Sequence, residues 1–233
     1  MVNIKLADIS VQLDNRYPDL AQLCRGYETE EVPQITLSVS QEEIEKERSL
    51  QADIFTDGYL ETVCLYRKLV LEMLRYNVFI LHASVVAVDG EGYAFLASSG
   101  TGKTTQTRLW LEYFGSRACV VNGDKPLIRY DGKQFVAYGT PWCGKEGMGC
   151  NTSVPLKALF FLERAAEPSC EPASEDYAVD RIFRQLLMPE RADQMERLLA
   201  LTDRLMETVP GYCLRCDMTR ASVIAAYNRV TGL

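Results

Sequence analysis

With 233 residues, 47% of them hydrophobic and 24% charged, the chain has the composition of an ordinary globular protein. Its net charge of -7 argues against a nucleic-acid partner, because such a partner requires a basic face. The sequence has no apolar run of membrane-spanning length and its N-terminus has no secretory pattern, so we expect a cytoplasmic protein without a membrane partner.

Residues 1–76 predict a small α+β layer that packs on the rest of the chain, since no linker sets it apart. Apolar and polar residues alternate over residues 2–13, which is typical of one half-buried strand. Ser40 and Glu43 form a capping-box pattern, which predicts the start of a short charged helix. The other predicted elements are a helix over residues 15–24, a strand over residues 35–40 and, after a turn at Asp57–Gly58, a helix over residues 60–75.

The sequence predicts a second, larger domain over residues 77–233. Strands over residues 78–88 and 93–97 are joined by a short turn, which predicts a β-hairpin, and a helix that starts at Thr104 is closed by Gly115. The further predicted elements are a strand over 118–124, a hairpin over 126–138, a strand over 156–162, helices over 180–188 and 191–209, a strand over 212–215 and a helix over 219–229, with an exposed loop over 167–176.

The stretch ASSGTGKT over residues 97–104 matches the phosphate-binding pattern G-x-x-x-x-G-K-[ST], except that Ala97 stands at its first position. The glycines let backbone N–H groups turn toward phosphate oxygens, and the lysine supplies a positive charge. A glycine-rich turn with a solvated lysine is the plainer alternative. The predicted nucleotide-binding residues are Ser99, Gly100, Thr101, Gly102, Lys103, Thr104 and Thr105, with the Thr104 hydroxyl placed to bind Mg²⁺.

Two residues outside the loop are candidates for chemistry. Asp124 ends the predicted apolar strand over residues 118–124, where a carboxylate can hold Mg²⁺, although Asn-Gly-Asp is also ordinary turn sequence. His82 lies one hairpin before the loop and within a predicted strand. A histidine there is compatible with acid–base work and equally with a packed core position.

A glycine-rich segment over residues 139–149 contains Lys145 and can approach a ligand closely or act as a lid. Lys145, Arg129 and Arg164 can each neutralise a phosphate, but each is also compatible with a solvated surface position. The eight cysteines include one CxxC without a second pair of matching spacing, so reduced structural thiols are favoured over a metal site.

These motifs resemble the HPr kinase/phosphorylase and phosphoenolpyruvate carboxykinase superfamily over roughly residues 78–165. The resemblance implies an α/β fold with a mixed, largely antiparallel sheet and a phosphate-loop helix, together with ATP, Mg²⁺ and phosphate transfer. The family has two adjacent acids where this chain has Gly123 and Asp124, which leaves His82 as the candidate base. The segments that carry the resemblance are LHAS from Leu81, SGTGKT from Ser99, VNGD from Val121, GTPWCGK from Gly139 and the strand from Pro155.

Together, the residues and the resemblance predict an ATP- and Mg²⁺-dependent phosphotransferase with His82, Lys103 and Asp124 as catalytic residues. The predicted acceptor is a hydroxyl, seryl in a protein, a peptide or a free amino acid, as in small stand-alone relatives of HPr kinase. The alternative is a nucleotide-binding regulatory or peptide-binding protein that has lost catalysis, which Ala97 and Gly123 favour. The acceptor, the choice between ATP and GTP and the oligomeric state stay open.

Overall fold

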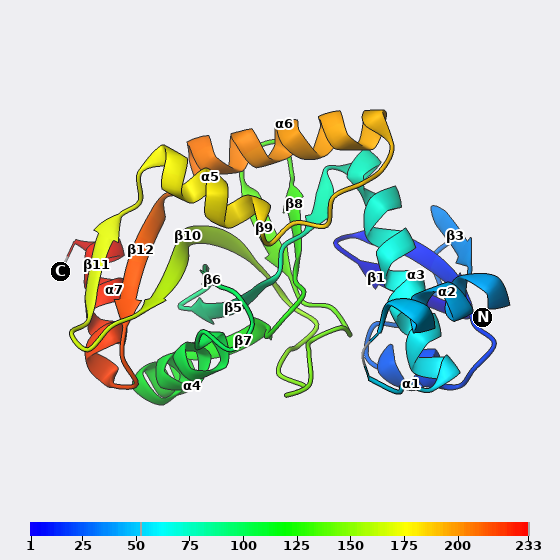
Figure 1. Cartoon of the computed structure of the whole chain (residues 1–233), viewed down its shortest axis with the longest axis horizontal. Helices are drawn as coiled ribbons and strands as arrows, with labels where there is room; N and C mark the ends of the chain where they lie inside the picture. Colours follow the sequence, from blue (N-terminus) through cyan, green and yellow to red (C-terminus); the bar gives the residue numbers. More distant parts are fainter. Residues whose placement is uncertain (52, 233) are drawn as a thin grey trace.

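The computed structural model describes residues 1–51 and 53–232. At the N-terminus a small sheet has the order β1 (Val2–Leu6), β2 (Ile9–Asp14), β3 (Ile35–Ser38), as Figure 1 shows in blue. The prediction of one strand over residues 2–13 is wrong, because Ala7 and Asp8 adopt positive φ angles of 48° and 61° and turn the chain into an antiparallel hairpin. β3 then pairs with β2 in parallel.

Three helices cover this sheet: α1 (Asp19–Leu23), α2 (Gln41–Leu50) and α3 (Asp57–Met73), which a 3₁₀ turn over Leu74–Tyr76 extends. The predicted capping box at Ser40 and Glu43 is confirmed. The predicted turn at Asp57–Gly58 is wrong, because the Thr56 side chain caps the helix and these residues form its first turn. The core of this region includes Val78, Leu127 and Trp142, so it extends past residue 76, and the domain boundary at 76/77 stays a prediction.

The larger sheet has nine strands in the described part of the chain, in the order β4-β8-β9-β10-β6-β5-β7, with β12 beside β10 and β11 beside β12. Within the described part of this larger sheet, only β10 makes parallel pairs, with β6 and β12, so the predicted fold class, α/β with a mixed and largely antiparallel sheet, is confirmed. Its strands are β4 (Val78–Ile80), β5 (Ala83–Val88), β6 (Glu91–Leu96), β7 (Ala118–Asn122), β8 (Leu127–Tyr130), β9 (Phe135–Tyr138), β10 (Ser153–Arg164), β11 (Ser169–Pro172) and β12 (Gly211–Cys216).

Helices lie on both faces of the larger sheet, because its central strands are apolar on both sides. Val85 and Ala87 of β5 face one core with α5 and α6, while Val86 and Val88 face a second core with α4 and α7. Figure 1 shows α6 and α4 on opposite sides of the sheet. These helices are α4 (Lys103–Phe114), followed by a 3₁₀ turn over Gly115–Arg117, α5 (Glu175–Phe183), α6 (Ala192–Thr208) and α7 (Arg220–Thr231).

Three further predictions are wrong. The predicted loop over 167–176 contains β11, which pairs with β12, and the helix predicted at 180–188 lies earlier, as α5. The strand predicted over 78–88 breaks at Leu81 and His82, whose N–H groups donate instead to the carbonyls of Pro126 and Gln185. This break separates β4 from β5 and takes His82 out of the strand ladder.

None of the helices in the described part of the chain combines the length and the hydropathy that a membrane crossing requires.

Candidate active site

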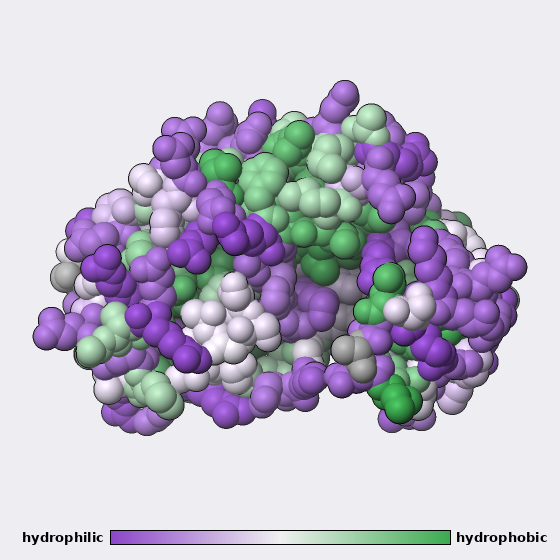
Figure 2. Space-filling model, viewed as in Figure 1, coloured by the Kyte–Doolittle hydropathy of each residue, from purple (hydrophilic) through white to green (hydrophobic). Residues whose placement is uncertain are grey.

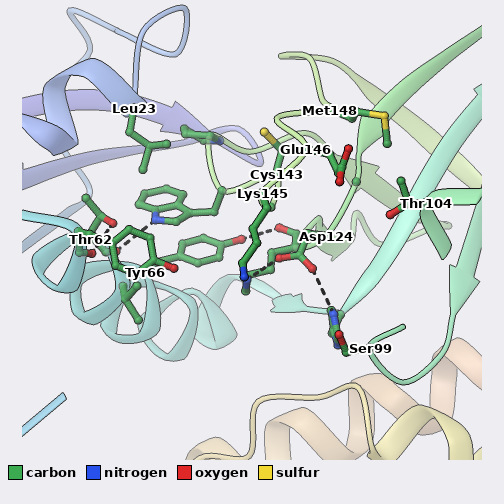
Figure 3. A pocket seen from close by; sticks show the side chains of 18 of the residues that line it. Leu23, Thr62, Tyr66, Ser99, Thr104, Asp124, Cys143, Lys145, Glu146 and Met148 are labelled. Atoms are coloured by element: carbon green, nitrogen blue, oxygen red, sulfur yellow. Dashed lines mark hydrogen bonds and ion pairs between the residues drawn. The ribbon is translucent and has the colours of Figure 1, made fainter. Parts of the chain in front are cut away.

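A cleft of about 1060 Å³ lies between the phosphate loop and helices α1–α3, and residues 141–148 form a third side. Figure 3 shows Thr62 and Tyr66 of α3 on one side of this cavity and Asp124, Thr104 and Ser99 on the other, with Lys145 between them in this view. The predicted site residues that line the cleft are Ser99, Gly100, Gly102, Lys103, Thr104, Thr105, His82, Asp124 and Lys145.

The phosphate loop is shaped by its glycines. Gly100 and Gly102 have φ angles of 78° and 133°, which residues other than glycine rarely adopt. Helix α4 begins directly after them at Lys103. Ala97 does not have a positive φ angle, so its departure from the motif needs no strained backbone. Its carbonyl accepts a hydrogen bond of 2.7 Å from the buried Lys103 Nζ. The lysine therefore lies along its own loop.

Arg164, at the end of β10, holds the loop from outside the cleft. Its Nε donates to the Thr101 carbonyl at 3.2 Å and its Nη2 to the Gly100 carbonyl. These contacts occupy two loop carbonyls, while the Thr101 N–H donates within the loop to the Ser98 carbonyl at 3.2 Å. The structure thus gives Arg164 a contact with the loop backbone, and Thr101, unlike the other predicted loop residues, is not among the residues that line the cleft.

His82 and Asp124 meet at the centre of the cleft, from elements 42 positions apart in the sequence. His82 Nε2 lies 3.2 Å from Asp124 Oδ1, and Lys125 Nζ contacts the other carboxylate oxygen. The buried Asn122 sets this geometry, because its Oδ1 accepts from the backbone N–H groups of Asp124 and Lys125 at 2.9 and 2.7 Å. This is an Asx turn, the structure that Asn-Gly-Asp sequences favour.

The environment of Asp124 favours its ionised form. Burial by itself raises the pKa of this carboxyl, but the hydrogen bonds and charges of His82 and Lys125 outweigh burial and hold the pKa well below its usual range. In Lys103 the same two effects compete: burial lowers the pKa of the ammonium, and the charge of Asp124 opposes that shift. At neutral pH the cleft therefore contains an ionised carboxylate.

Gly123 occupies the position at which the HPr kinase and carboxykinase superfamily, which this sequence resembles, has an acidic residue. A Cβ at this position would lie 3.0 Å from the Met148 carbonyl oxygen and 3.4 Å from that of Cys143. The Gly123 N–H donates to the same Met148 carbonyl at 2.8 Å. Because the glycine-rich segment closes directly over residue 123, a carboxylate there would displace it.

The glycine-rich segment is anchored to α3. The Trp142 ring stacks on Tyr66 with centroids 4.1 Å apart, and Trp142 Nε1 donates to the Thr62 carbonyl at 3.2 Å. Tyr66 in turn donates to the Lys125 carbonyl at 2.8 Å. Lys145 is exposed beyond this anchor and lines the cleft. Trp142 thus fixes the glycine-rich segment to α3, and Lys145 extends from the segment into the cleft.

Arg129 is not brought into the cleft. Its guanidinium Nη1 donates to the Ala7 carbonyl at 2.8 Å and contacts Asp8 at 3.1 Å, so it joins β8 to the turn of the N-terminal hairpin.

Sequence reasoning did not single out Asn122 or Arg67, although the Asn-Gly-Asp signal pointed to the first. Arg67 lines the cleft from α3 and pairs with the buried Glu47. A position within a predicted helix does not by itself indicate that an arginine lines a cleft or pairs with a buried glutamate.

The residues present fit a magnesium–nucleotide complex. Mg²⁺ uses one or two carboxylates, hydroxyls, water and substrate phosphates as ligands, and does not require an all-protein cage. Asp124 offers a carboxylate and Thr104 a hydroxyl on the same wall of the cleft. No cluster of three or more His, Cys, Asp or Glu side chains suited to a metal occurs in residues 1–51 and 53–232. The oxygen donors match magnesium held partly by phosphate.

Comparison with known proteins identifies the family. A family model described as "SynChlorMet cassette protein ScmC" matches residues 56–221, well over half of the chain. The chain belongs to the ScmC family. The ScmC match includes α3, the phosphate loop, Asp124 and the glycine-rich segment, and leaves out the part of the cleft that α1 and α2 supply.

Among solved structures, the chain is similar to the HPr(Ser) kinase/phosphatase from Coxiella burnetii, with 9% identity and a TM-score of 0.39. The alignment covers 66% of this chain and 97% of that one. No curated protein matches the chain. The likeness to an HPr kinase is therefore distant.

Proposed function

We propose that the chain is an ATP- and Mg²⁺-dependent phosphotransferase that acts on a hydroxyl acceptor, seryl in a protein, a peptide or a free amino acid. One observation carries the proposal: Lys103, Thr104, His82 and Asp124 line a single cleft, with the histidine 3.2 Å from the carboxylate. The sequence resemblance to HPr kinase and the carboxykinases supports the choice of ATP and of a seryl acceptor.

In this proposal the phosphate loop binds the nucleotide. The N–H groups of the loop and of the first turn of α4 face the phosphate oxygens, and Lys103 turns from the Ala97 carbonyl to the terminal phosphates. Thr104 and Asp124 would hold Mg²⁺, which would supply neutralisation of phosphate charge. Phosphoryl transfer depends mainly on placement and charge neutralisation, so this small set of side chains is sufficient for it.

His82 activates the acceptor. With its Nε2–H donated to Asp124, the imidazole keeps Nδ1 as the proton acceptor. The acceptor hydroxyl gives its proton to Nδ1, its oxygen bonds to the γ-phosphorus, and the bond from that phosphorus to the β–γ bridging oxygen breaks to release ADP. Asp124 orients the ring and stabilises the imidazolium that forms.

The second candidate is a nucleotide-binding regulatory protein without turnover. The tight packing around Gly123 favours it, because no second carboxylate fits beside Asp124. It requires tight Mg-ATP binding and no phosphoryl transfer to any acceptor, so binding and transfer measured on the same preparation separate the two candidates.

The proposal is tested by phosphoryl transfer from Mg-ATP to free serine and to seryl peptides, followed by ³¹P NMR. We expect transfer by the wild type and a kcat about 10²- to 10⁴-fold lower in His82→Gln, with the nucleotide Kd unchanged, because a general base acts on the reacting proton and not on ATP binding. Arg191→Gln, an exposed arginine paired with Asp193, is the control and retains full activity. ATP binding without transfer to any acceptor favours the regulatory protein.

A further inference from the structure

A second, smaller cavity of about 280 Å³ adjoins the cleft behind His82. The two spaces are neighbours, because five residues line both: Val63, Tyr66, Arg67, His82 and Lys125. The volume equals that of about nine water molecules. It is therefore suited to a group of amino-acid size and too small for a nucleotide.

This side cavity is cationic, although the chain as a whole has a net charge of -7. Arg67, Lys125 and Arg184 line it, and no aspartate or glutamate does so among the described residues. The carboxylates that pair with these cations, Glu47, Asp124 and Asp180, lie outside the lining of the cavity. An anionic ligand in this cavity would therefore share Arg67, Lys125 and Arg184 with carboxylates that already pair with them.

The cavity also contains a buried polar group without a partner. Gln185 is 7% exposed and lines the cavity, and its Oε1 accepts no hydrogen bond within the part of the chain that the structure describes. Because Oε1 itself is closed off from solvent, a ligand N–H reaches it only when the Gln185 amide turns toward the cavity, and that turn would give a buried unpaired acceptor its partner. The backbone of the same residue is already used, because the Gln185 carbonyl accepts from the His82 N–H at 2.8 Å.

The rest of the lining is aliphatic. Val70 comes from α3, Ile80 from β4, and Leu186 and Leu187 from the segment that joins α5 to α6. Figure 2 shows hydrophobic residues gathered over the region below α6, next to the hollow at the centre of this face. The cavity thus offers an apolar surface, cationic side chains and one hydrogen-bond acceptor beside His82.

From these features we infer that the side cavity binds the acceptor through a free α-carboxylate. The carboxylate faces Arg67, Lys125 and Arg184, the adjoining amide or amino N–H donates to Gln185 Oε1, and an apolar group contacts the leucines. The hydroxyl then lies toward His82 and the phosphate loop. This inference rests on the proposed function and narrows its acceptor to a hydroxy amino acid with a free carboxyl group, either free or at the C-terminus of a peptide.

Binding tests the inference independently of turnover. Acetyl-Leu-Ser with a free carboxylate and its C-terminal amide are titrated by calorimetry into the protein with Mg²⁺ and adenylyl imidodiphosphate. We expect the amide to bind at least about tenfold more weakly, because it loses charged hydrogen bonds of about 1.5–3 kcal/mol. Free L-serine forms a second arm: binding as tight as that of the dipeptide identifies the free amino acid as the source, and weaker binding identifies a chain end.

Variants locate the effect. In Arg184→Gln the ratio of amide Kd to acid Kd falls by up to about fivefold, as for an exposed ion pair, and Gln185→Leu weakens both ligands about fivefold. Arg191→Gln, equally exposed and likewise paired with an aspartate, leaves the ratio unchanged. Equal binding of acid and amide, a ratio that Arg184→Gln does not change, or no binding of either ligand overturns the inference.

The same samples with ATP separate this inference from the proposed function. Carboxylate-dependent binding without any phosphoryl transfer leaves the side-cavity site standing and removes the phosphotransferase. Transfer to the acid and the amide with equal KM removes the side-cavity site and leaves the phosphotransferase standing.

Discussion

The two walls of the cleft are built in different ways. The phosphate-loop wall comes mainly from one segment, residues 99–105, in which glycine φ angles and backbone groups set the shape, with Asp124 on the same side of the cleft. The opposite wall comes from side chains of α1, α2 and α3, which are spread over residues 19–67 and held by packing and ion pairs. A local sequence motif specifies a wall made of backbone, whereas a wall made of side chains depends on the folded arrangement. The two walls should therefore respond differently to substitution.

The largest effect is expected on the phosphate-loop wall. Lys103→Met removes the positive charge that faces the terminal phosphates, and we expect phosphoryl transfer to fall about 10²- to 10³-fold, as for the loss of one charge-stabilising donor. Stability should change less than activity, because the hydrogen bond of the Lys103 side chain goes to its own loop, at the Ala97 carbonyl. Lys157→Met, whose Nζ pairs with Glu91 away from the cleft, is the control. Equal rates for both variants in the ³¹P NMR assay would contradict the assignment of Lys103.

On the α3 wall the expected loss is in stability. Arg67→Met leaves the Glu47 carboxylate, 1% exposed, with only Gln51 as a side-chain partner, and we expect the free energy of unfolding to fall by about 2–3 kcal/mol. Urea denaturation measures this loss. The double variant Arg67→Met/Glu47→Met should recover most of it, because no buried charge remains unpaired. A double variant as unstable as the single one would refute the ion-pair explanation.

A smaller effect is expected where the glycine-rich segment meets Gly123. Gly123→Ala places a methyl group 3.0 Å from the Met148 carbonyl, and we expect destabilisation of about 1–2 kcal/mol and faster hydrogen exchange over residues 143–149. Gly211→Ala meets the Phe161 ring at the same distance, far from this segment in sequence, and serves as the control. Its exchange over 143–149 should stay unchanged. Slow exchange in Gly123→Ala would show that the segment does not close on residue 123.

The smallest effect is the pH dependence that Asp124 contributes. Its pKa in the folded state lies below the unfolded value of about 3.9, so its stabilising effect is fully present above that pH and is lost as the pH falls toward the folded pKa. The stability difference between wild type and Asp124→Asn should thus be constant from pH 7 to 5 and shrink at pH 3. Asp203→Asn, at an exposed position of α6, is the control. A difference that grows on acidification would contradict the sign.

The sequence was sufficient for the parts that depend on local pattern. The hairpin before the loop, the Ser40 capping box and the helix that Gly115 ends are all confirmed. Alternation alone did not reveal the turn at Ala7–Asp8, because Asp8 is compatible with a left-handed conformation but alanine, at Ala7, rarely adopts one. It also did not reveal the break at His82, which is held by the distant carbonyls of Pro126 and Gln185.

The same distinction applies to the candidate site. The motif and the acid after β7 could be named from the sequence, and the structure brings them into one cleft with His82. The sequence could not indicate a role for Arg67, Gln185 and Arg184. Helix and loop residues of these types are usually solvated, and only tertiary packing places them beside His82. Arg129 shows the converse, since a charged strand residue near the motif bonds to the N-terminal hairpin.

The most direct test of the account is a crystal structure with Mg²⁺ and adenylyl imidodiphosphate. We predict that the phosphates lie against the N–H groups of residues 99–105, that the metal contacts Thr104 and Asp124, and that the terminal phosphate faces His82. A nucleotide bound elsewhere, or a loop that stays empty at saturating nucleotide with Lys103 still on the Ala97 carbonyl, would contradict it.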